Sequence, residues 1–285
     1  MHLGASWTHS ELKLVPKMAP EIAPKITKMG PKTCPNLGFG FGLVFGCLAT
    51  LGGKPVLRDI SLSIPEGMTI GLTGPTGSGK TILAKLLLRR LDPSEGQVFL
   101  GLNDLRDIPL RALRQHIRCA PQEPFLFSAT LEDNVFQGMT NRDRDAMLWA
   151  SEVSQLKKEA EQFNDGFKTM LGERGVTLSG GQRQRTALAR TIAGNPHVLI
   201  LDDTLSAVDT QTESAILKGL EPVLTERTGI LISHRVSTLR NTDFIVVLQE
   251  GRITQMGSHD ELLREEGYYR EQHELQQIEA RLESL

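Results

Sequence analysis

GPTGSGKT, Gly74 to Thr81, lies between the short apolar run TIGLT at Thr69–Thr73 and the amphipathic segment ILAKLLLRR at Ile82–Arg90. A strand, a glycine-rich turn ending in Lys and Thr, and a helix form the context that a phosphate-binding loop requires. The glycines let successive backbone N–H groups converge on one anion, and the helix start adds its positive dipole end. A chance glycine-rich turn is the alternative, and the flanking elements argue against it.

Each residue of this loop has an expected part in binding a nucleotide. Lys80 reaches the β- and γ-phosphates, and the hydroxyl of Thr81 binds Mg²⁺. A second apolar run, HVLILDD at His197–Asp203, ends in acid, so a buried strand there delivers Asp202 beside the loop as a further Mg²⁺ partner. The remaining residues expected to hold the phosphates are Gly74, Pro75, Thr76, Gly77, Ser78 and Gly79.

Between these two motifs, LSGGQRQR at Leu178–Arg185 opens another helix with glycines. Ser179, Gly180 and Gly181 at a helix start make a second anion cradle, and Gln182 adds a side-chain donor. Two phosphate-binding helix starts for one nucleotide are redundant within a single chain. The redundancy is removed if the second cradle serves a nucleotide that is held by another subunit.

The composition excludes several classes of protein. The 285 residues are 39% hydrophobic and 23% charged, which excludes a disordered chain, a collagen-like repeat and a disulfide-stapled miniprotein. Lys and Arg number 32 against 34 Asp and Glu, so no basic surplus indicates nucleic acid as the main partner. The cysteines Cys34, Cys47 and Cys119 show no metal-ligand spacing, which indicates a reducing compartment. No series of long apolar spans is present, which excludes a polytopic membrane protein.

Further motifs complete a fixed order along the chain: GPTGSGKT, APQEPF around Gln122, LSGGQRQR, LILDD, SAVD at Ser206–Asp209, and ISH ending in His234. In this order they resemble the ATP-binding cassette (ABC) transporter ATPases over residues 52–285. LGERGVTLSGGQ at Leu171–Gln182 and FLFSATLEDNV after Gln122 resemble the exporter class. LDDTLSAVDTQTE and the tail GYYREQHELQQIEARLE most resemble one subunit of heterodimeric bacterial multidrug exporters.

The resemblance implies that the cofactors are ATP and Mg²⁺. Thr81, Gln122 and Asp202 bind the metal directly or through water. Asp203 stands at the place of the general base, His234 contacts the γ-phosphate, and Gln122 is the third residue with a catalytic part. A plain helix cap is the alternative for His234.

The resemblance also implies partners. Ser179, Gly181 and Gln182 clamp the γ-phosphate of a nucleotide on a second ABC subunit, and Asp209 communicates between the two sites. A heterodimer is favoured and a homodimer is possible. The loop Glu123–Phe127 lies near the coupling helices of an exporter transmembrane domain, at the cytoplasmic face of a bacterial cell membrane. Glu173 and Arg174 also touch that membrane domain in the exporter class, although a solvated charge pair is their alternative.

The chain departs from the family at the general base, which is normally Glu and is here Asp203. The shorter side chain displaces the carboxylate by about 1 Å, and a misplacement of about 1 Å can cost about 100-fold in rate. In heterodimeric exporters, one subunit carries this Asp and its own site is nearly inactive. The intact LSGGQ can still complete a partner's site. Asp203 as a competent base is the alternative.

A second departure concerns the adenine. The family stacks the base on an aromatic residue a few positions before PVLRDISL, where this chain has Ala49, Thr50 and Leu51. The nearest aromatic residue is Phe45. Because base stacking contributes about 1–3 kcal/mol, we expect weak nucleotide binding unless Phe45 folds in.

Residues 1–51 form an atypical segment without a membrane domain. Interleaved Pro and Lys from Lys13 to Pro35 are typical of an unstructured basic arm. The following LGFGFGLVFGCLATL is too short and too rich in glycine for a membrane span. A signal peptide is one alternative, and the alternation of Phe39, Phe41, Leu43 and Phe45 favours an edge strand. We expect this segment to be poorly ordered and to lack the family's usual first strand. A truncated gene, a shifted reading frame or a wrong start is the hypothesis for its origin, and a native segment is the alternative.

Residues 52–285 are predicted to form an α/β ABC ATPase domain. Its P-loop NTPase core has a mostly parallel sheet, an antiparallel β edge and an inserted α-helical subdomain over residues 123–181 that carries the signature motif. Core strands are expected near Ser61–Ile64, Thr69–Thr73, Ile117–Ala120, Val198–Asp202, Gly229–Ser233 and Phe244–Leu248. Antiparallel edge strands are expected at Gln97–Leu100 and Arg252–Met256, and a helical tail with a solvated charged face at Ser258–Leu285.

The leading interpretation is an ATP-hydrolysing subunit that powers a membrane exporter. A catalytically weak nucleotide-binding subunit that completes a partner's site is the second, and Asp203 separates the two. A soluble DNA-repair or translation ATPase of the same superfamily is the third. The single cassette, the missing coiled-coil insertion and the net charge of −2 disfavour the third. The sequence identifies no residues that would select a transported substrate.

Overall fold

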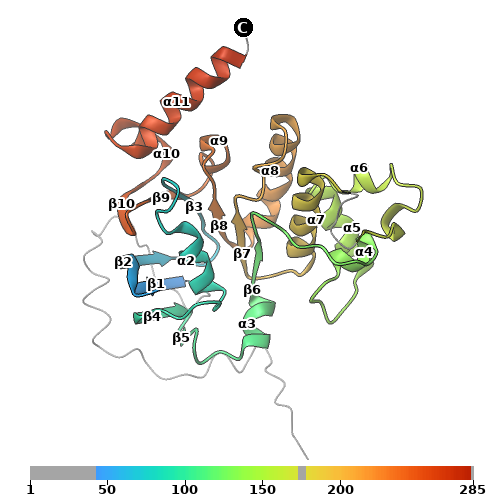
Figure 1. Ribbon diagram of the computed structural model, residues 1–285, viewed down its shortest axis with the longest axis horizontal. Coiled ribbons are helices and arrows are strands. Elements are labelled where there is room, and N and C mark those ends of the chain that lie inside the picture. Colours follow the sequence, from blue (N-terminus) through green and yellow to red (C-terminus); the bar gives the residue numbers. More distant parts are fainter. Residues whose placement is uncertain (1–42, 173–177, 284–285) are drawn as a thin grey trace, which may run out of the picture.

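The computed structural model describes residues 43–172 and 178–283, and the described strands form two sheets (Figure 1). The first has the order β2-β1-β4-β5 and comprises β1 (Leu43–Leu51), β2 (Lys54–Ile64), β4 (Glu95–Leu100) and β5 (Asn103–Asp104). The second has the order β10-β9-β3-β8-β7-β6 and comprises β3 (Thr69–Thr73), β6 (Ile117–Ala120), β7 (Val198–Asp202), β8 (Thr228–Ile232), β9 (Phe244–Gln249) and β10 (Arg252–Gly257).

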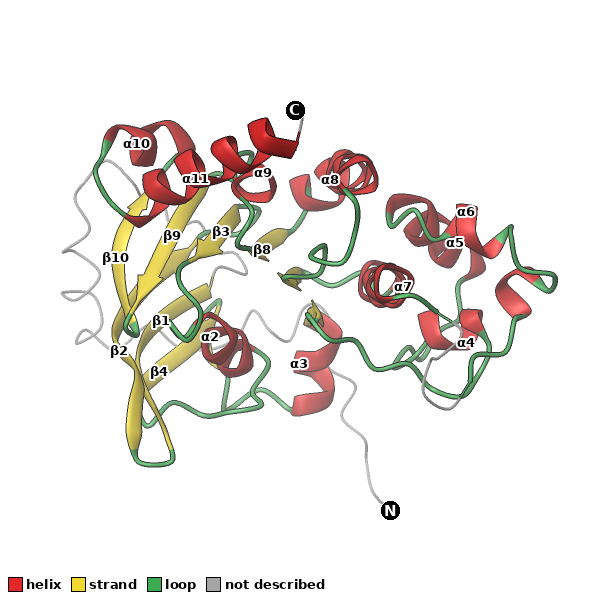
Figure 2. Cartoon of the chain, turned by 45° about the horizontal axis from the view of Figure 1, so that its top comes forward, coloured by secondary structure: helices red, strands yellow, loops and turns green. Residues whose placement is uncertain are grey.

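Two groups of helices lie on different sides of the molecule. α2 (Lys80–Leu87) and α3 (Leu110–His116) lie near the first sheet, and Figure 2 shows the helical subdomain on the opposite side of the molecule. That subdomain contains α4 (Leu131–Val135), α5 (Arg144–Val153), α6 (Lys157–Ala160), the short 3₁₀ helix η2 (Gly166–Lys168) and α7 (Gly180–Ala193). The remaining helices are α8 (Thr210–Thr225), α9 (Val236–Leu239), α10 (His259–Arg264) and α11 (Tyr268–Glu283).

The centre of the second sheet is parallel and buried. β3 pairs in parallel with β8 and β9, and β7 pairs in parallel with β6 and β8. Every residue of β3, β7 and β8 is buried, as expected for a parallel sheet covered on both faces. Val198 and Ile200 pack with apolar side chains of α2, whereas Leu199 and Leu201 pack with those of α7 and α8. Because side chains alternate along β7, this strand contacts helices on both faces of the sheet.

The inserted helical subdomain has a core of its own. Leu131 and Val135 of α4 pack with Met147 of α5 and with Ala189 of α7. The side chain of Thr130 accepts a hydrogen bond from the backbone of α4 at its first turn, which is a preferred way to begin a helix. The predicted fold class is therefore confirmed, including its parallel sheet and its helical insertion.

The strands predicted in the domain are all present, with differences at their ends and neighbours. β2 begins at Lys54, well before the predicted start at Ser61. β10 lies at one end of its sheet, as predicted, but β4 lies between β1 and β5 and is not an edge strand. The helical tail is confirmed as α10 and α11. Among the described residues, no helix combines the length and the apolar composition that crossing a bilayer requires.

The expectation that the first strand is missing is wrong, because β1 is present and pairs with both β2 and β4. The strand favoured around Phe39–Phe45 overlaps the start of β1, but β1 lies between β2 and β4 and is not an edge strand. Its inward side chains Leu43, Cys47 and Ala49 are buried, whereas Gly46 and Thr50 are exposed. No charged residue marks the outer face of this strand, so the usual polar–apolar alternation was not visible in the sequence.

β1 also bears on the predicted division at residue 51. That division falls between β1 and β2, which pair as an antiparallel hairpin. Phe39 and Phe41, with the rest of residues 1–42, lie outside the described residues, and so does the side chain of Phe45. The expectation of an atypical segment before the domain therefore stays a hypothesis for residues 1–42.

Leu43→Ala tests whether β1 belongs to the folded core. The Leu43 side chain is 0% exposed, and truncating a buried Leu costs about 2–5 kcal/mol of stability. Urea unfolding followed by circular dichroism should therefore give a clearly lower midpoint. Leu275→Ala, at a residue of α11 that is 52% exposed, is the matched control and should leave the midpoint unchanged. Equal midpoints for the two variants would contradict the packing of β1.

Candidate functional site

The phosphate loop joins β3 to α2 and depends on glycine at its two ends. Gly74 has a φ of 143°, and a Cβ there would lie 1.9 Å from the carbonyl oxygen of Leu248. Gly79 has a φ of 109°, and a Cβ there would lie 2.6 Å from a methyl group of Leu57. Both positions therefore require glycine for close packing. No side chain caps α2, which leaves its first N–H groups available to an anion.

Lys80 folds back over this loop. Its ammonium group donates to the carbonyl oxygens of Gly74, at 2.7 Å, and Pro75, at 2.9 Å. Burial lowers the pKa of Lys80, and the charges of Asp203 and Asp202 act in the opposite direction. A buried cation is thus held at the start of α2, where it adds to the positive end of the helix dipole.

Asp202 and Thr81 fit the role of Mg²⁺ ligands. Burial and the neighbouring charge of Asp203 raise the pKa of Asp202, against the influence of Lys80. A cation between the two carboxylates and the exposed Thr81 hydroxyl would relieve this repulsion, and oxygen donors are the ligands that Mg²⁺ prefers. The described residues contain no group of three or more His, Cys, Asp or Glu side chains that could hold a metal ion. Asp202 and Thr81 thus supply oxygen donors suited to Mg²⁺.

Asp203 and Gln122, two of the predicted catalytic residues, are in contact. Gln122 Nε2 donates to Oδ2 of Asp203 at 3.1 Å. Asp203 has a φ of 46°, in the left-handed region that Asp enters more readily than most residues. Its N–H donates to the carbonyl of Ile232 at 2.8 Å, and its carbonyl accepts from the Ser206 hydroxyl at 2.8 Å. The backbone that carries the carboxylate is therefore fixed on both sides.

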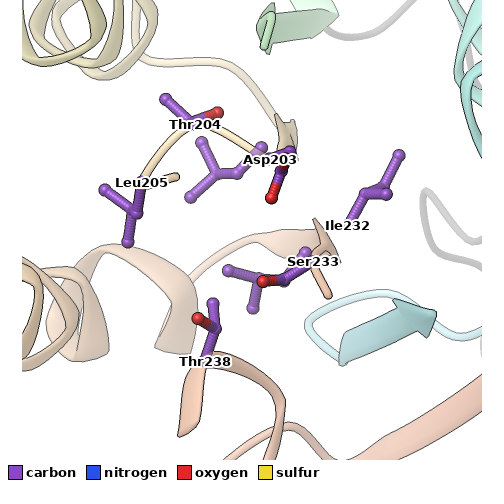
Figure 3. Close-up of a pocket in the computed structure, with 8 residues that line it drawn as sticks. Asp203, Thr204, Leu205, Ile232, Ser233 and Thr238 are labelled. Carbon is purple, nitrogen blue, oxygen red and sulfur yellow. The ribbon is translucent and has the colours of Figure 1, made fainter. Parts of the chain in front are cut away.

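A small cavity lies behind Asp203, between the ends of β7 and β8 (Figure 3). Its volume of about 10 Å³ has room for about one water molecule. Figure 3 shows Asp203 and Ser233 on the neighbouring strand ends that border this space, with Thr238 beside them. The cavity is too small to be the nucleotide site.

His234 follows β8 and lies in the field of the same charged residues. Partial burial and the charge of Lys80 lower the pKa of His234, whereas Asp203 acts to raise it. The N-cap of the following helix α9 is Arg235, so His234 is not the plain helix cap that was considered as its alternative. The structure thus brings His234 together with Lys80 and Asp203.

Ser179 and Gln182 form a capping box at the start of α7. The Ser179 hydroxyl accepts from the Gln182 N–H at 3.2 Å, and Gln182 Oε1 accepts from the Ser179 N–H at 2.9 Å. Gly180 is the first residue of the helix. A Cβ at Gly181 would lie 2.9 Å from the carbonyl oxygen of Ala207. The second predicted cradle is therefore a well-defined helix start.

The two helix starts are separate. In Figures 1 and 2, α2 and α7 lie apart, with β6 and β7 between them. Asp209, which was predicted to link two sites, caps α8 through a hydrogen bond that its Oδ1 accepts from the Thr212 N–H at 2.9 Å. This bond lowers the pKa of Asp209. Glu173 and Arg174 lie outside the described residues.

Gln184 is a site residue to which the sequence analysis gave no role. Its Nε2 donates to the Gln122 carbonyl at 3.3 Å and to the Ser206 hydroxyl at 3.0 Å, and its Oε1 accepts from the Ala207 N–H at 3.0 Å. The side chain is 4% exposed. One buried amide therefore ties α7 to the loop after β6 and to the loop after β7. The sequence offered one signal for this role: Gln184 is polar but lies on the face of α7 that is buried, where a polar side chain needs hydrogen-bond partners.

A family model described as ABC transporter matches residues 57–206. The chain belongs to the ABC transporter family. ATP binding and the P-loop architecture follow from that membership, and the resemblance seen in the sequence motifs is confirmed.

Similar proteins include a multidrug resistance transporter, a lipid flippase and an ABC exporter of known structure. The probable multidrug resistance ABC transporter ATP-binding/permease protein YheI of Bacillus subtilis is 41% identical over 222 residues, which are 78% of this chain and 38% of that protein. The ATP-dependent lipid A-core flippase of Chromobacterium violaceum is 43% identical over 223 residues, 78% of this chain and 38% of that protein. A solved bacterial Atm1-family ABC exporter with ATP bound is 34% identical with a TM-score of 0.80, and the match covers 86% of this chain and 44% of that one. The chain therefore spans less than half the length of these relatives.

At the place predicted for the adenine platform, the side chains of Ala49 and Thr50 are described. Thr50 is exposed in β1, and its hydroxyl shares a hydrogen bond with the Ser94 hydroxyl at 2.6 Å. Ala49 is 3% exposed and faces the core. The side chains of Leu51 and Phe45 lie outside the described residues, so stacking by Phe45 stays a hypothesis.

Lys80→Ala removes the buried cation from the phosphate loop of the ABC domain. A hydrogen bond to a charged group contributes about 1.5–3 kcal/mol, so the affinity for Mg-ATP should fall by about tenfold to 100-fold. Isothermal titration calorimetry measures this affinity. Lys218→Ala, on the exposed face of α8, is the control and should bind like the unmodified chain. Equal affinity for the Lys80→Ala and Lys218→Ala variants would remove the phosphate-loop assignment.

Thr50→Tyr supplies the missing adenine platform. ATP binding should tighten by up to about tenfold, which is the low end of the base-stacking range. Thr50→Ala is the matched control, because it also removes the hydroxyl pair with Ser94 but adds no ring. If the Tyr and Ala variants bind ATP with equal dissociation constants, either Phe45 already stacks or this segment does not lie near the base.

Proposed function

We propose that this ABC domain is the ATP-binding and ATP-hydrolysing subunit that powers an exporter. The observation that carries the proposal is the grouping of Lys80, Asp202, Asp203, Gln122 and His234 at one edge of the parallel sheet. Ligands of open parallel sheets bind at the carboxyl ends of the strands, which is this edge. The names of the relatives, a multidrug resistance transporter, a lipid flippase and an ABC exporter, support transport as the use of the hydrolysis energy.

The loop and its metal residues bind the nucleotide. The N–H groups of the loop and Lys80 hold the β- and γ-phosphates, which replace the carbonyl oxygens of Gly74 and Pro75 as partners of the ammonium. Thr81, Asp202 and Gln122 would hold Mg²⁺, directly or through water. A metal held there would supply positive charge against the phosphates.

Asp203 and His234 act on the γ-phosphate and the attacking water. Asp203 takes the proton from the water, and the hydrogen bond from Gln122 orients its carboxylate. The lowered pKa of His234 favours a neutral imidazole, which can still donate one hydrogen bond to a γ-phosphate oxygen. Both groups are general acid–base candidates by position.

Two subunits complete each site in this proposal. Ser179 and Gln182 lie on a helix start that is separate from the phosphate loop, and this separation supports a nucleotide sandwiched between the loop of one chain and the signature of another. Asp209, at the start of α8, lies on the segment that would pass information between the sites. A heterodimer is favoured over a homodimer, because Asp203 is a poor base whereas the capping box is intact.

Reduced hydrolysis at the chain's own site is the second candidate function. Asp203 is one methylene shorter than Glu, its backbone is fixed by Ile232 and Ser206, and its carboxylate is already bonded to Gln122. The side chain therefore has little freedom to move the missing distance of about 1 Å, which can cost about 100-fold in rate. The chain would then serve mainly to complete the active site of a partner that carries Glu.

An exposed aromatic pair supports docking of a transmembrane domain. Phe125 and Phe127 are 67% and 42% exposed, and their rings meet edge to face at 5.0 Å. Arg190 of α7 donates to the Phe125 carbonyl at 3.0 Å, so the signature helix holds this loop in place. Exposed aromatic patches mark interaction sites. We propose that the chain itself works at the cytoplasmic face of a bacterial cell membrane, docked on the transmembrane domain.

Asp203→Glu tests the division of labour. If the short base limits the reaction, steady-state phosphate release by the purified chain should be slow, and the substitution should raise it by about tenfold to 100-fold. Asp203→Asn, which cannot take a proton, is the control and should not raise it. Fast release by the unmodified chain, with no gain from Glu, would make Asp203 a competent base.

The sandwich is tested in the Asp203→Glu background. Adding Ser179→Arg should abolish phosphate release, because a bulky cation then occupies the cradle that the opposing nucleotide needs. Ser214→Arg, on the exposed side of α8, is the control. Unchanged turnover with Ser179→Arg would exclude the sandwich.

A further inference from the structure

The backbone on either side of Arg235 is bound by a side chain of α11. Gln276 Nε2 donates to the His234 carbonyl at 2.7 Å, and Gln276 Oε1 accepts from the Val236 N–H at 2.9 Å. Figures 1 and 2 show α11 beside α9, the short helix that starts at Val236. The NH₂ group and the oxygen of one side-chain amide therefore both form hydrogen bonds with the segment that carries His234.

The contact satisfies a helix start that has no cap of its own. α9 runs only from Val236 to Leu239, and its N-cap Arg235 makes no side-chain capping bond. The first N–H groups of a helix need acceptors from elsewhere. For Val236 that acceptor comes from Gln276, on a helix that begins 32 residues later at Tyr268.

The opposite side of the same segment is held by α8. Arg235 pairs with Glu213, which is 3% exposed and also accepts from the Thr238 hydroxyl at 2.7 Å. The Arg235 guanidinium also donates to the carbonyl of Ser206 at 3.3 Å. The His234 segment is thus clamped between α8 and α11, with Gln276 supplying the contact from α11.

General packing does not explain this contact. The first turn of α11 is anchored by Tyr269, which is 0% exposed. Further along the helix, Leu275 and Ile278 are 52% and 54% exposed, so apolar burial does not hold α11 at the level of Gln276. The two hydrogen bonds are specific interactions at a place where the helix otherwise faces solvent.

We propose that α11 positions His234, and that Gln276 is the positioning residue. The amide fixes the His234 carbonyl and the Val236 N–H, and so keeps the imidazole beside Lys80 and Asp203. Its importance for turnover rests on the proposed function, in which His234 contacts the γ-phosphate. The C-terminal helix then takes part in ATP hydrolysis without contributing an atom to the nucleotide site.

Gln276→Leu in the full chain removes both hydrogen bonds at similar side-chain size. Gln277→Leu is the matched control, because within the part of the chain that the structure describes the neighbouring Gln277 bonds inside α11, to His273 at 3.1 Å. Hydrogen exchange at the Val236 amide should become faster by about five- to tenfold in Gln276→Leu, as expected for the loss of one hydrogen bond. The His234 imidazole signals in NMR should also move. Gln277→Leu should leave both unchanged.

Two further experiments distinguish a positioning role of Gln276 from a role in folding, and distinguish failure of this proposal from failure of the proposed function. Gln276→Glu keeps the acceptor for Val236 but loses the donor to His234, so exchange at Val236 should stay slow while the His234 signals move. In the Asp203→Glu background, Gln276→Leu should lower kcat and leave KM unchanged. If the Val236 amide and the His234 signals do not change in Gln276→Leu, the proposal is wrong. If ATP leaves the His234 signals of the unmodified chain unmoved, the proposed contact with the γ-phosphate fails, whatever Gln276 does.

Discussion

The parallel register of β3, β8 and β7 is the constraint on which the site depends. Leu72, Ile232 and Asp202 are paired side by side across the three strands. The loops that follow therefore leave the sheet at the same level, which brings the phosphate loop, Asp203 and His234 to one edge. A shift of one residue in this pairing would turn the Asp202 side chain to the other face of the sheet.

A second set of interactions connects this edge of the sheet to the helix α7. Gln184 and Arg190 lie on the signature helix and bond to the Gln122 and Phe125 carbonyls. The signature motif at the start of α7, the loop after β6 that carries Gln122, and the exposed aromatic pair are therefore joined through α7. The Phe125 backbone and the Asp203 carboxylate are therefore linked by side-chain hydrogen bonds through α7 and Gln122.

The sequence was sufficient for features that depend on local chemistry. A strand, a glycine-rich turn and a helix specify the phosphate loop, and the buried run ending in Asp202 specifies its acidic partner, because each depends on adjacent residues. β1 was anticipated only at its start, by the alternation that includes Leu43 and Phe45, and was not recognised as the family's first strand because its outer face carries no charge. Gln184 and Gln276 were missed because an amide on a helix gives no local sign of its partners. Those partners lie 62 and 42 residues away in the chain for the Gln122 and His234 carbonyls. The charged tail was interpreted as a solvated face, and the tertiary contact of Gln276 is an exception within it.

The capping box at α7 also leaves hydrogen-bond donors, and no acceptors of the box, exposed at the start of the helix. Its two hydrogen bonds use acceptor atoms, the Ser179 hydroxyl oxygen and the Gln182 carbonyl oxygen. The hydroxyl hydrogen of Ser179 and the amide hydrogens of Gln182 stand outside the box. Together with the positive end of the helix dipole, such a surface discriminates by the sign of charge before any shape is matched. An anion that reaches this surface meets hydrogen-bond donors, whereas a cationic group there meets no acceptor from the box and is repelled by the helix start, an effect confined to the first turn.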